Sequence, residues 1–528
     1  MLGRSVWLAI GATSAVRLWV IWGSFFWQDD YVHIWTAWNA PPADLIAQNW
    51  NGHREPIGFA VQWLLARAAP QVWWPAALLL SVIAVATTVV FWLLVRRWGG
   101  VTPGTAAAAI LFAAWPATML PQQWLSAGLE SVALLLLLVA GWLLGRPRRW
   151  TPVAVGLCAV LAWGFHERAA YFLPVLFAIA WLFDETGGPR YRGAATGWRA
   201  NRASWVTLLV VTALALAVRI GDGIPGRSGG TSLPGAMWAA GPGSVLRSVF
   251  GWLPFDPEQR SVVPVGLGLW SLLVLAVWMM LLLVGLSLEP HRTVLLGGMV
   301  LAVFAVELLS FTLLRGGFAG SLLAGDPRFT LITGTLLLAG LGSYRNLARG
   351  VVPGALVLAC LGGWSMWQIG RPDDPGREWL AAARQTPGDA ALAATPSPPA
   401  MLAHFFFTTE PPVYELGTTR TLLQVGPQPY DFPRIAVDPQ QVAQDASVGP
   451  LRFTPLLTDS RRQCGAVTPP VLDAGVRVVR MSLTGPAVVE GVPVRSGVVY
   501  VFPPPGEVAP VRVRGSCVDG VEVGVPGR

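Results

Sequence analysis

The apolar stretch at residues 73–95, WWPAALLLSVIAVATTVVFWLLV, decides the fold class. It contains no charged residue and exceeds the length of about 20 apolar residues that a helix needs to cross a bilayer. Arg96 and Arg97 follow it directly. Because arginine-rich connections stay in the cytoplasm, the sequence predicts a transmembrane helix whose C-terminal end faces the cytoplasm.

Ten further apolar runs extend this pattern, at residues 5–26, 104–120, 126–145, 151–166, 169–183, 204–219, 263–287, 293–314, 329–343 and 350–369. Arginines cluster in alternate connections, at residues 96–97, 146–149, 190–202, 292 and 345–349. This alternation predicts a polytopic α-helical protein of the plasma membrane with about eleven transmembrane helices. The N-terminus is expected in the cytoplasm, and the region after residue 370 outside it.

The composition supports a membrane protein. Of the 528 residues, 53% are hydrophobic and only 12% are charged, whereas soluble domains have about 25% charged residues. All 37 basic residues are arginine, which excludes a Walker-type phosphate loop and a Schiff-base lysine. The net charge of +8 follows the predicted topology, so we expect membrane lipids and not nucleic acid as partners.

The chain is expected to divide near residue 370. Residues 1–370 form the predicted membrane domain, with outer segments at 27–72 and 219–262. The first contains a predicted interfacial helix at 55–69, and the second is expected to be a loop with local structure. Residues 371–528 form a predicted extracytoplasmic soluble domain, with a helix at 377–385 and a mainly β C-terminal half whose strands cover 477–483, 487–494, 497–502, 510–515 and 520–524.

The four cysteines fall into two groups. Cys158 and Cys360 lie within predicted helices, where they are expected to be small apolar residues. Cys464 and Cys517 both lie in the predicted extracytoplasmic domain, where disulfides form and persist. We therefore predict a disulfide between Cys464 and Cys517.

The strongest polar motif follows the first apolar run and reads WQDDYVH at residues 27–33. Paired carboxylates at a membrane boundary are costly unless they are solvated, paired or bound to metal. Asp29 is a candidate general base that takes a proton from a sugar hydroxyl. Asp30 is a candidate to bind the acceptor or a divalent cation, Mg²⁺ or Mn²⁺. Alternatively, the pair only ends the helix in headgroup water.

Two further ionisable motifs fall on the same predicted outer face. The run NGHREP at residues 51–56 either forms a small polar substrate site or caps the helix that follows it. The short connection after residue 165 either binds substrate or is an ordinary polar turn. The candidate substrate-binding residues of these motifs are His53, Arg54, Glu55, His166, Glu167 and Arg168.

Arg328 is the last main candidate, in the motif Asp326-Pro327-Arg328-Phe329 just before an apolar run. A guanidinium at the outer headgroup level suits a phosphate diester, although such an arginine can also extend to the interface without a ligand. Glu130, Arg17 and Glu307 are weaker candidates, the last two alternatively as a structural pair.

The pattern resembles the GT-C superfamily of membrane glycosyltransferases, in particular actinobacterial arabinosyl- and mannosyltransferases. The shared features are an acidic motif directly after the first helix, a first outer loop with interfacial helices, many spans and an outer β-rich domain. The resemblance covers the architecture of residues 1–370 and is specific in sequence only around Asp29-Asp30. The NGHREP run departs from the His-Pro-Pro type of pattern expected in protein mannosyltransferase-like members, which puts that substrate class in doubt.

The resemblance implies that the chain is a hexosyl- or pentosyltransferase of cell wall biogenesis. Such an enzyme moves a sugar from a polyprenyl-phosphate donor to an extracytoplasmic glycan or lipid acceptor. It implies that Asp29 is the catalytic aspartate, that Asp30 is the second acidic position and that Arg328 contacts the lipid phosphate. His53 and Glu55 match polar positions of the first outer loop. A membrane transporter, a non-catalytic glycan-binding or assembly protein and a lipid-linked ligase are the alternatives.

Overall fold

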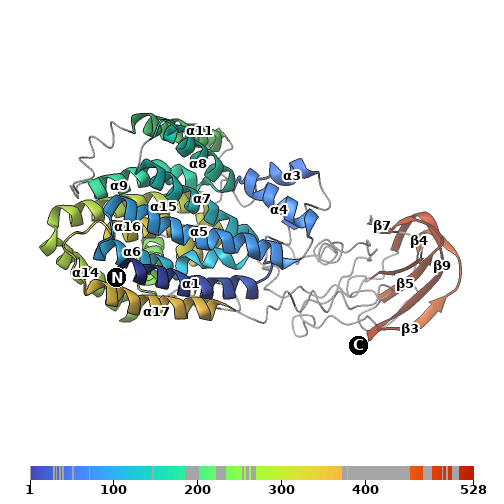
Figure 1. Ribbon diagram of the computed structural model, residues 1–528. Coiled ribbons are helices and arrows are strands. Elements are labelled where there is room, and N and C mark those ends of the chain that lie inside the picture. Colours follow the sequence, from blue (N-terminus) through green and yellow to red (C-terminus); the bar gives the residue numbers. More distant parts are fainter. Residues whose placement is uncertain are drawn as a thin grey trace. The chain divides into compact units, whose positions relative to one another are not determined.

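The computed structural model describes residues 2–27, 30, 33–34, 37, 41–49, 53–69, 72–145, 148–184, 201–221, 233–251, 255–256, 261–262, 269–370, 377, 452–467, 478–489, 492–494, 497–501 and 511–527 (Figure 1). The chain divides into two compact units. The first, called the helical unit, contains residues 1–25, 41–65 and 72–372. The second contains residues 26–40, 66–71 and 373–528.

The helical unit is a bundle of apolar helices (Figure 1). Its longer helices are α1 (Leu2–Gly23), α4 (Pro56–Ala68), α5 (Trp73–Gly99), α6 (Pro103–Ala113), α7 (Leu125–Leu144), α8 (Thr151–Phe165), α9 (Phe172–Asp184), α11 (Arg202–Gly221), α14 (Leu269–Leu288), α15 (Pro290–Ala324), α16 (Leu331–Leu341) and α17 (Val351–Ile369). The shorter elements are α3 (Pro42–Ile46), η1 (Pro116–Thr118), η2 (Leu120–Gln123), η3 (Glu167–Tyr171), α12 (Leu233–Ala240), η4 (Gly241–Val245), α13 (Leu246–Val249) and η5 (Pro327–Thr330), with the two-residue strands β1 (Phe255–Asp256) and β2 (Ser261–Val262).

Each predicted apolar run overlaps one of these helices, namely α1, α5 to α9, α11 and α14 to α17. Among the described residues, six helices are long and apolar enough to cross a membrane: α1, α5, α7, α14, α15 and α17. Helices α6 and α8, most of α11, and η5 with α16 are shorter apolar segments. The chain is therefore mostly helical and compatible with a membrane protein, and the full number of spans stays a prediction.

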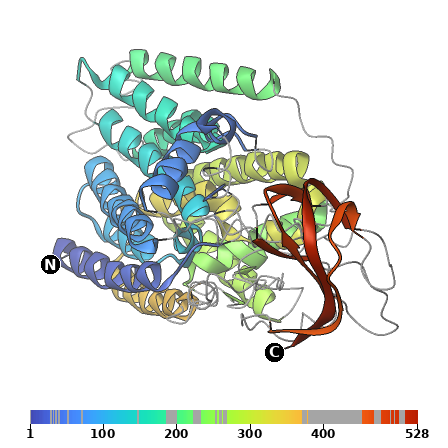
Figure 2. The same cartoon turned by 90° about the vertical axis from the view of Figure 1, so that its right-hand side faces the viewer.

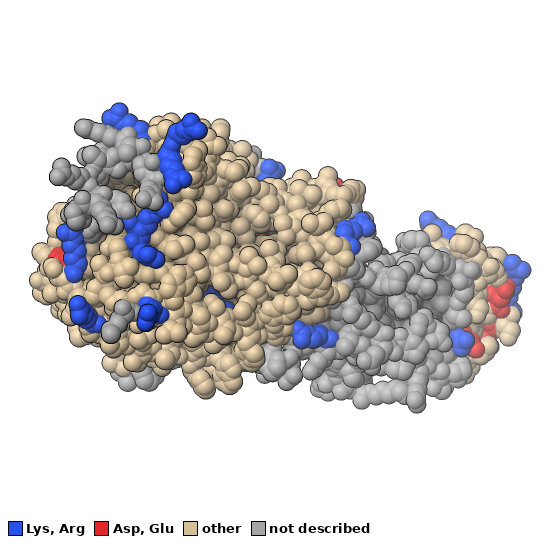
Figure 3. Space-filling view, viewed as in Figure 1, with Lys and Arg blue, Asp and Glu red and all other residues tan. Residues whose placement is uncertain are grey.

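Side chains join helix ends and define the two ends of the bundle. At one end, Trp98 donates to the carbonyl of Gly141 at 3.0 Å, and Asn201 donates to the carbonyl of Leu144 at 3.2 Å. At the other end, Trp73 donates to the carbonyl of Ile21 at 2.8 Å. Several arginines near helix ends lie at the end of the bundle that contains Trp98: Arg96 and Arg97 in the last turn of α5, Arg202 and Arg292 in the first turns of α11 and α15, and Arg345 after α16. Most basic side chains that Figure 3 shows on the helical unit gather toward its left-hand end. The arginine-rich connections therefore share one end of the bundle.

Small residues let the helices approach one another closely. The alanines of α6 from Ala106 to Ala109 are fully or almost fully buried. A Cβ added to Gly334 of α16 would collide with the ring of Trp115, and one added to Gly362 of α17 would collide with the backbone of Ala114. Small residues are typical of helix interfaces in membranes, where close van der Waals packing drives association.

The second predicted outer segment is more ordered than expected. Its described part at residues 233–251 is not a loop, because it forms α12, η4 and α13. Ala236 and Ala240 are buried against Leu308 of α15. The apolar face of α12 explains the difference, since it packs into the bundle and offsets the glycines and prolines that suggested a loop.

The described C-terminal part forms an antiparallel sheet. Its strands are β3 (Arg452–Asp459), β4 (Gln463–Val467), β5 (Val478–Leu483), β6 (Ala487–Val489), β7 (Val492–Val494), β8 (Gly497–Val501) and β9 (Val511–Gly527). The order is β7-β6-β9-β5-β8, and β3 and β4 also pair with β9. Val479, Met481 and Leu483 of β5 are buried, as the two-residue period of a strand requires.

The long strand β9 organises this sheet, and Figure 2 shows it as one bent strand. Two separate strands at 510–515 and 520–524 were predicted there, and that division is wrong because β9 continues through both. Cys464 of β4 lies opposite Cys517 of β9, and the two are joined by a disulfide, as predicted. The predicted helix at 377–385 lies outside the described residues except Arg377.

Candidate functional site

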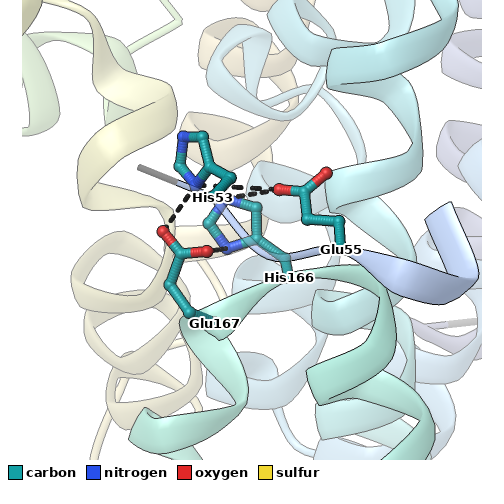
Figure 4. Close-up of side chains that lie close together, drawn as sticks. All are labelled: His53, Glu55, His166 and Glu167. Carbon is teal, nitrogen blue, oxygen red and sulfur yellow. Dashed lines mark hydrogen bonds and ion pairs between the residues drawn. The ribbon is translucent and has the colours of Figure 1, made fainter. Parts of the chain in front are cut away.

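Two of the predicted ionisable motifs meet in the helical unit, although 114 residues separate His53 from Glu167. The Nδ1 of His53 lies 2.6 Å from Oε1 of Glu167 and 3.7 Å from Oε1 of Glu55. The Nε2 of His166 lies 3.7 Å from the same oxygen of Glu55. Figure 4 shows the two imidazoles and the two carboxylates turned toward one another. We call these four residues the His–Glu cluster.

The start of α4 positions the first pair. The carbonyl of Glu55 accepts the backbone N–H of Phe59 at 2.8 Å, so Glu55 precedes the first turn as the predicted capping alternative requires. Its side chain is nevertheless directed toward the two imidazoles. Glu55 is therefore both a backbone cap and a member of the His–Glu cluster. Arg54, between His53 and Glu55, is exposed.

The junction of α8 and η3 positions the second pair. His166 ends α8 with an extended backbone, and its Nδ1 accepts the backbone N–H of Arg168 at 3.1 Å. The ring proton of neutral His166 is therefore on Nε2, which faces the carboxylates. Burial lowers the pKa of His166 to about 3, against the opposing effect of Glu167 and Glu130. His166 is thus neutral at physiological pH.

Glu130 of α7 extends the cluster. Its Oε2 lies 3.6 Å from Nε2 of His166 and 3.4 Å from Nη2 of Arg168. Arg168 is buried, with 7% of its surface exposed. Glu130 is a weaker candidate in the sequence because it is a single acid within an apolar run. The only sequence signal that points to it is its position near the predicted outer end of that run, on the same predicted face as the His166 motif.

Arg328 is held next to this cluster by its own local structure. Asp326 accepts the backbone N–H of Arg328 at 2.9 Å, which caps η5, and its Oδ2 lies 2.9 Å from Nε of Arg328. The guanidinium carbon lies 5.2 Å from the ring centre of Trp124 and 4.9 Å from that of Phe329. This stacking fixes the plane of the guanidinium.

Charge couples Asp326 to the other polar groups. Burial raises the pKa of Asp326 above its usual value, Arg328 and Arg168 oppose the rise, and Glu130 adds to it. The groups at 130, 168, 326 and 328 therefore lie within electrostatic range of one another. The predicted motifs around His166 and Arg328 belong to one polar region at the end of the bundle opposite the arginine-rich connections.

The two charged residues predicted within helices have separate structural partners. Arg17 donates to the carbonyls of Ala113 and Trp115 and to the side chain of Gln122. Glu307 accepts the backbone N–H groups of Ile332 and Thr333 at 3.2 and 3.0 Å. The alternative of an Arg17–Glu307 pair is wrong, because each side chain satisfies backbone groups at a different helix end.

The acidic motif after α1 is described only in part. Asp29 lies outside the described residues. Asp30 is buried, and its carboxylate accepts the backbone N–H of Trp27 at 3.1 Å. This hydrogen bond gives Asp30 a local structural role, and its predicted role in binding an acceptor or a metal stays a prediction.

The His–Glu cluster is the part of the described chain whose donors suit a metal. His53, Glu55, His166 and Glu167 each offer one ligand atom, and these atoms lie within 4.8 Å of one another. Imidazole nitrogen and carboxylate oxygen are common ligands of divalent transition metals. Carboxylates in hydrogen-bond range of neutral imidazoles can alternatively relay or accept protons.

No protein-family model matches this chain, and no curated protein matches its sequence.

Proposed function

We propose that this chain is a membrane glycosyltransferase of the GT-C type. It transfers a hexosyl or pentosyl group from a polyprenyl-phosphate donor to an extracytoplasmic glycan or lipid acceptor. The observation that carries the proposal is the convergence of His53, Glu55, Glu130, His166, Glu167, Arg168 and Arg328 at one end of an apolar bundle. Ionisable groups at the end of a membrane bundle are expensive to maintain and typical of functional sites.

The two arginines suit a phosphate leaving group. Arg168 is buried against Glu130, and the guanidinium of Arg328 lies over the ring of Trp124. A planar guanidinium that is fixed before the substrate arrives binds phosphate oxygens with little loss of side-chain entropy. We propose that Arg328, assisted by Arg168, neutralises the phosphate as negative charge develops on it.

An apolar cavity supports a lipid-linked donor. The cavity has a volume of about 420 Å³ and lies among α12, η4, α13, α15 and α16. It is lined by Met237, Trp238, Gly241, Pro242, Val245, Leu246, Val300, Leu301, Phe304, Thr333 and Leu337. Thr333, its one hydroxyl-bearing lining residue, follows Arg328 by five positions. A prenyl chain in this cavity would place its phosphate toward Arg328.

The proposed reaction is a single displacement. Asp29 takes the proton of an acceptor hydroxyl, whose oxygen forms a bond to the anomeric carbon of the donor. The bond between that carbon and the phosphate oxygen breaks, and its electron pair leaves with the prenyl phosphate. Asp30 is proposed to orient the acceptor. The configuration at the anomeric carbon inverts, because the attack and the departure take place on opposite faces.

The proposed orientation follows from the arginines. The end of the bundle with Arg96, Arg97, Arg202, Arg292 and Arg345 faces the cytoplasm, as the positive-inside rule requires. The polar region then faces outward, and the chain lies in the plasma membrane with an extracytoplasmic C-terminal region. In that compartment the disulfide between Cys464 and Cys517 is stable.

The direct experiment is a transfer assay with the full-length protein in detergent. Purified protein is incubated with radiolabelled prenyl-phosphate pentoses and hexoses and with glycan acceptors. Arg328→Gln is expected to lower the rate by about 100- to 1,000-fold, as the loss of one charge-stabilising donor does in other enzymes. Arg345→Gln, at the opposite end of the bundle, is the matched control and should keep the wild-type rate. Equal rates in the two variants would refute the proposed role of Arg328.

A further inference from the structure

We infer that His53, Glu55, His166 and Glu167 bind one divalent transition-metal ion of the zinc type. The metal expected from the sequence was Mg²⁺ or Mn²⁺ at Asp30, so this site differs in both its position and its ligands. A role of the ion in sugar transfer rests on the proposed function, whereas the binding of the ion does not.

The spacing of the four residues fits a coordination shell. Their ligand atoms lie within 4.8 Å of one another. Any two ligands of a tetrahedral zinc ion are about 3.4 Å apart, since each bond is about 2.1 Å long. Side-chain rotations that bring the most distant ligand atoms about 1.4 Å closer together therefore place all four on one ion. Only the pair His53 Nδ1 and Glu167 Oε1, 2.6 Å apart, has to separate on binding.

The charge of the region favours a cation. The carboxylates of Glu55, Glu130 and Glu167 each lie within 3.7 Å of an imidazole nitrogen of His53 or His166. Glu55 is 5% exposed. A cation that binds such carboxylates directly offsets the cost of removing them from water, so this arrangement suits a doubly charged ion.

The donor set selects the class of metal. Two imidazole nitrogens and two carboxylate oxygens match the ligands of Zn²⁺, and of Mn²⁺ or Co²⁺ in mixed sites. Mg²⁺ and Ca²⁺ prefer shells made of oxygen alone. We therefore expect the site to bind Zn²⁺ much more tightly than Mg²⁺ or Ca²⁺.

Neighbouring groups orient the proposed ligands. His166 would bind the ion through Nδ1, the ring nitrogen without a proton, which lies 3.9 Å from Oε2 of Glu167. The ion then replaces the hydrogen bond from the backbone N–H of Arg168 to Nδ1. The proton on Nε2 lies on the side of Glu130, whose Oε2 is 3.6 Å away, and a carboxylate that accepts the other ring N–H of a metal-bound histidine is a regular feature of metal sites. Glu55 precedes helix α4, whose first turn fixes its backbone.

The experiment measures metal binding by the full-length protein in detergent, without substrate. Protein is stripped with a chelator, dialysed and titrated with Zn²⁺, and the bound metal is counted by mass spectrometry. We expect about one ion per chain, with binding weakened at least ~100-fold in His53→Gln and Glu167→Gln. His291→Gln and Glu522→Gln, which change the same residue types outside the cluster, should bind like the wild type. Equal zinc binding in all five proteins would overturn the inference.

A second measurement covers variants that fail to fold. Stripped wild-type protein is titrated with Co²⁺, and its visible absorption is recorded. Ligand-field bands of a nitrogen- and oxygen-coordinated ion, saturating at one Co²⁺ per chain and abolished by Zn²⁺, support the site. Their absence overturns it. A protein that binds one zinc ion and transfers no sugar would contradict the proposed function and support the metal site.

Discussion

The Nδ1 of His53 and Oε1 of Glu167 lie 2.6 Å apart, although the five helices α4 to α8 lie between the two residues in the sequence. This contact joins the segment before α4 to the turn between α8 and α9. It fixes the segment before α4 against the bundle at the place where the other polar motifs converge. The polar region is therefore a product of tertiary packing and not of any one motif.

Acidification is expected to destabilise the chelator-treated protein through His166. Burial holds its pKa at about 3, below the ordinary value of 6.5, so the unfolded chain binds a proton first as the pH falls. Stability is unaffected by this group above pH 6.5 and declines between 6.5 and 3. Lowering the pH from 7 to 5 should cost about 2 kcal/mol through this residue.

Thermal unfolding in detergent with chelator, at several pH values, checks this expectation. His166→Asn should show a smaller loss of stability between pH 7 and pH 5 than the wild type. The variant His291→Gln should keep the full loss. Parallel curves for wild type and His166→Asn would contradict the assignment.

Glu307 is predicted to be structural. Its carboxylate accepts two backbone N–H groups at the start of α16, which would otherwise be buried without partners. Glu307→Ala is expected to destabilise the bundle by about 2 kcal/mol, because it leaves those donors unsatisfied. Val306→Ala, at the adjacent and exposed position, is the control. If both variants unfolded at the same temperature, the capping role of Glu307 would be excluded.

The disulfide between Cys464 and Cys517 is predicted to stabilise the sheet. The bridge closes a segment with a sequence separation of 53 residues. A closed loop of that length stabilises the folded state by about 4 kcal/mol, mainly by limiting the unfolded chain. Cys464→Ser with Cys517→Ser should make the C-terminal region sensitive to protease at lower temperatures. Cys158→Ser, at a free and buried cysteine, should not change that sensitivity.

Much of the helical architecture follows from the sequence, because long apolar runs leave few alternatives. The run at 293–314 predicted the start of α15 closely, yet α15 continues to Ala324 past Arg315. The predicted run ends at Leu314, but helical hydrogen bonds do not require an apolar side chain, so the helix extends further. Two strands were predicted at 510–515 and 520–524, whereas pairing with several partner strands keeps β9 continuous.

The members of the polar region could be predicted in part. His53, Glu55, His166 and Glu167 stood out as ionisable groups at the ends of apolar runs. Their separation could not be predicted, because it depends on how α4 and α8 pack. The partners of Arg17 were also beyond sequence reasoning, since two of them are backbone carbonyls, which every residue carries.

The measurement that tests the proposed activity most directly compares sugar transfer by wild type, Asp29→Asn and Asp44→Asn in proteoliposomes. Each receives the same radiolabelled prenyl-phosphate sugars and glycan acceptors. Asp44 is an exposed acid of the same segment between α1 and α5 and serves as the matched control. We expect sugar transfer by wild type and Asp44→Asn. The transfer rate of Asp29→Asn is expected to be at least ~100-fold lower, with donor binding retained. Undiminished transfer by Asp29→Asn, or no transfer by folded wild-type protein with any donor, would contradict it.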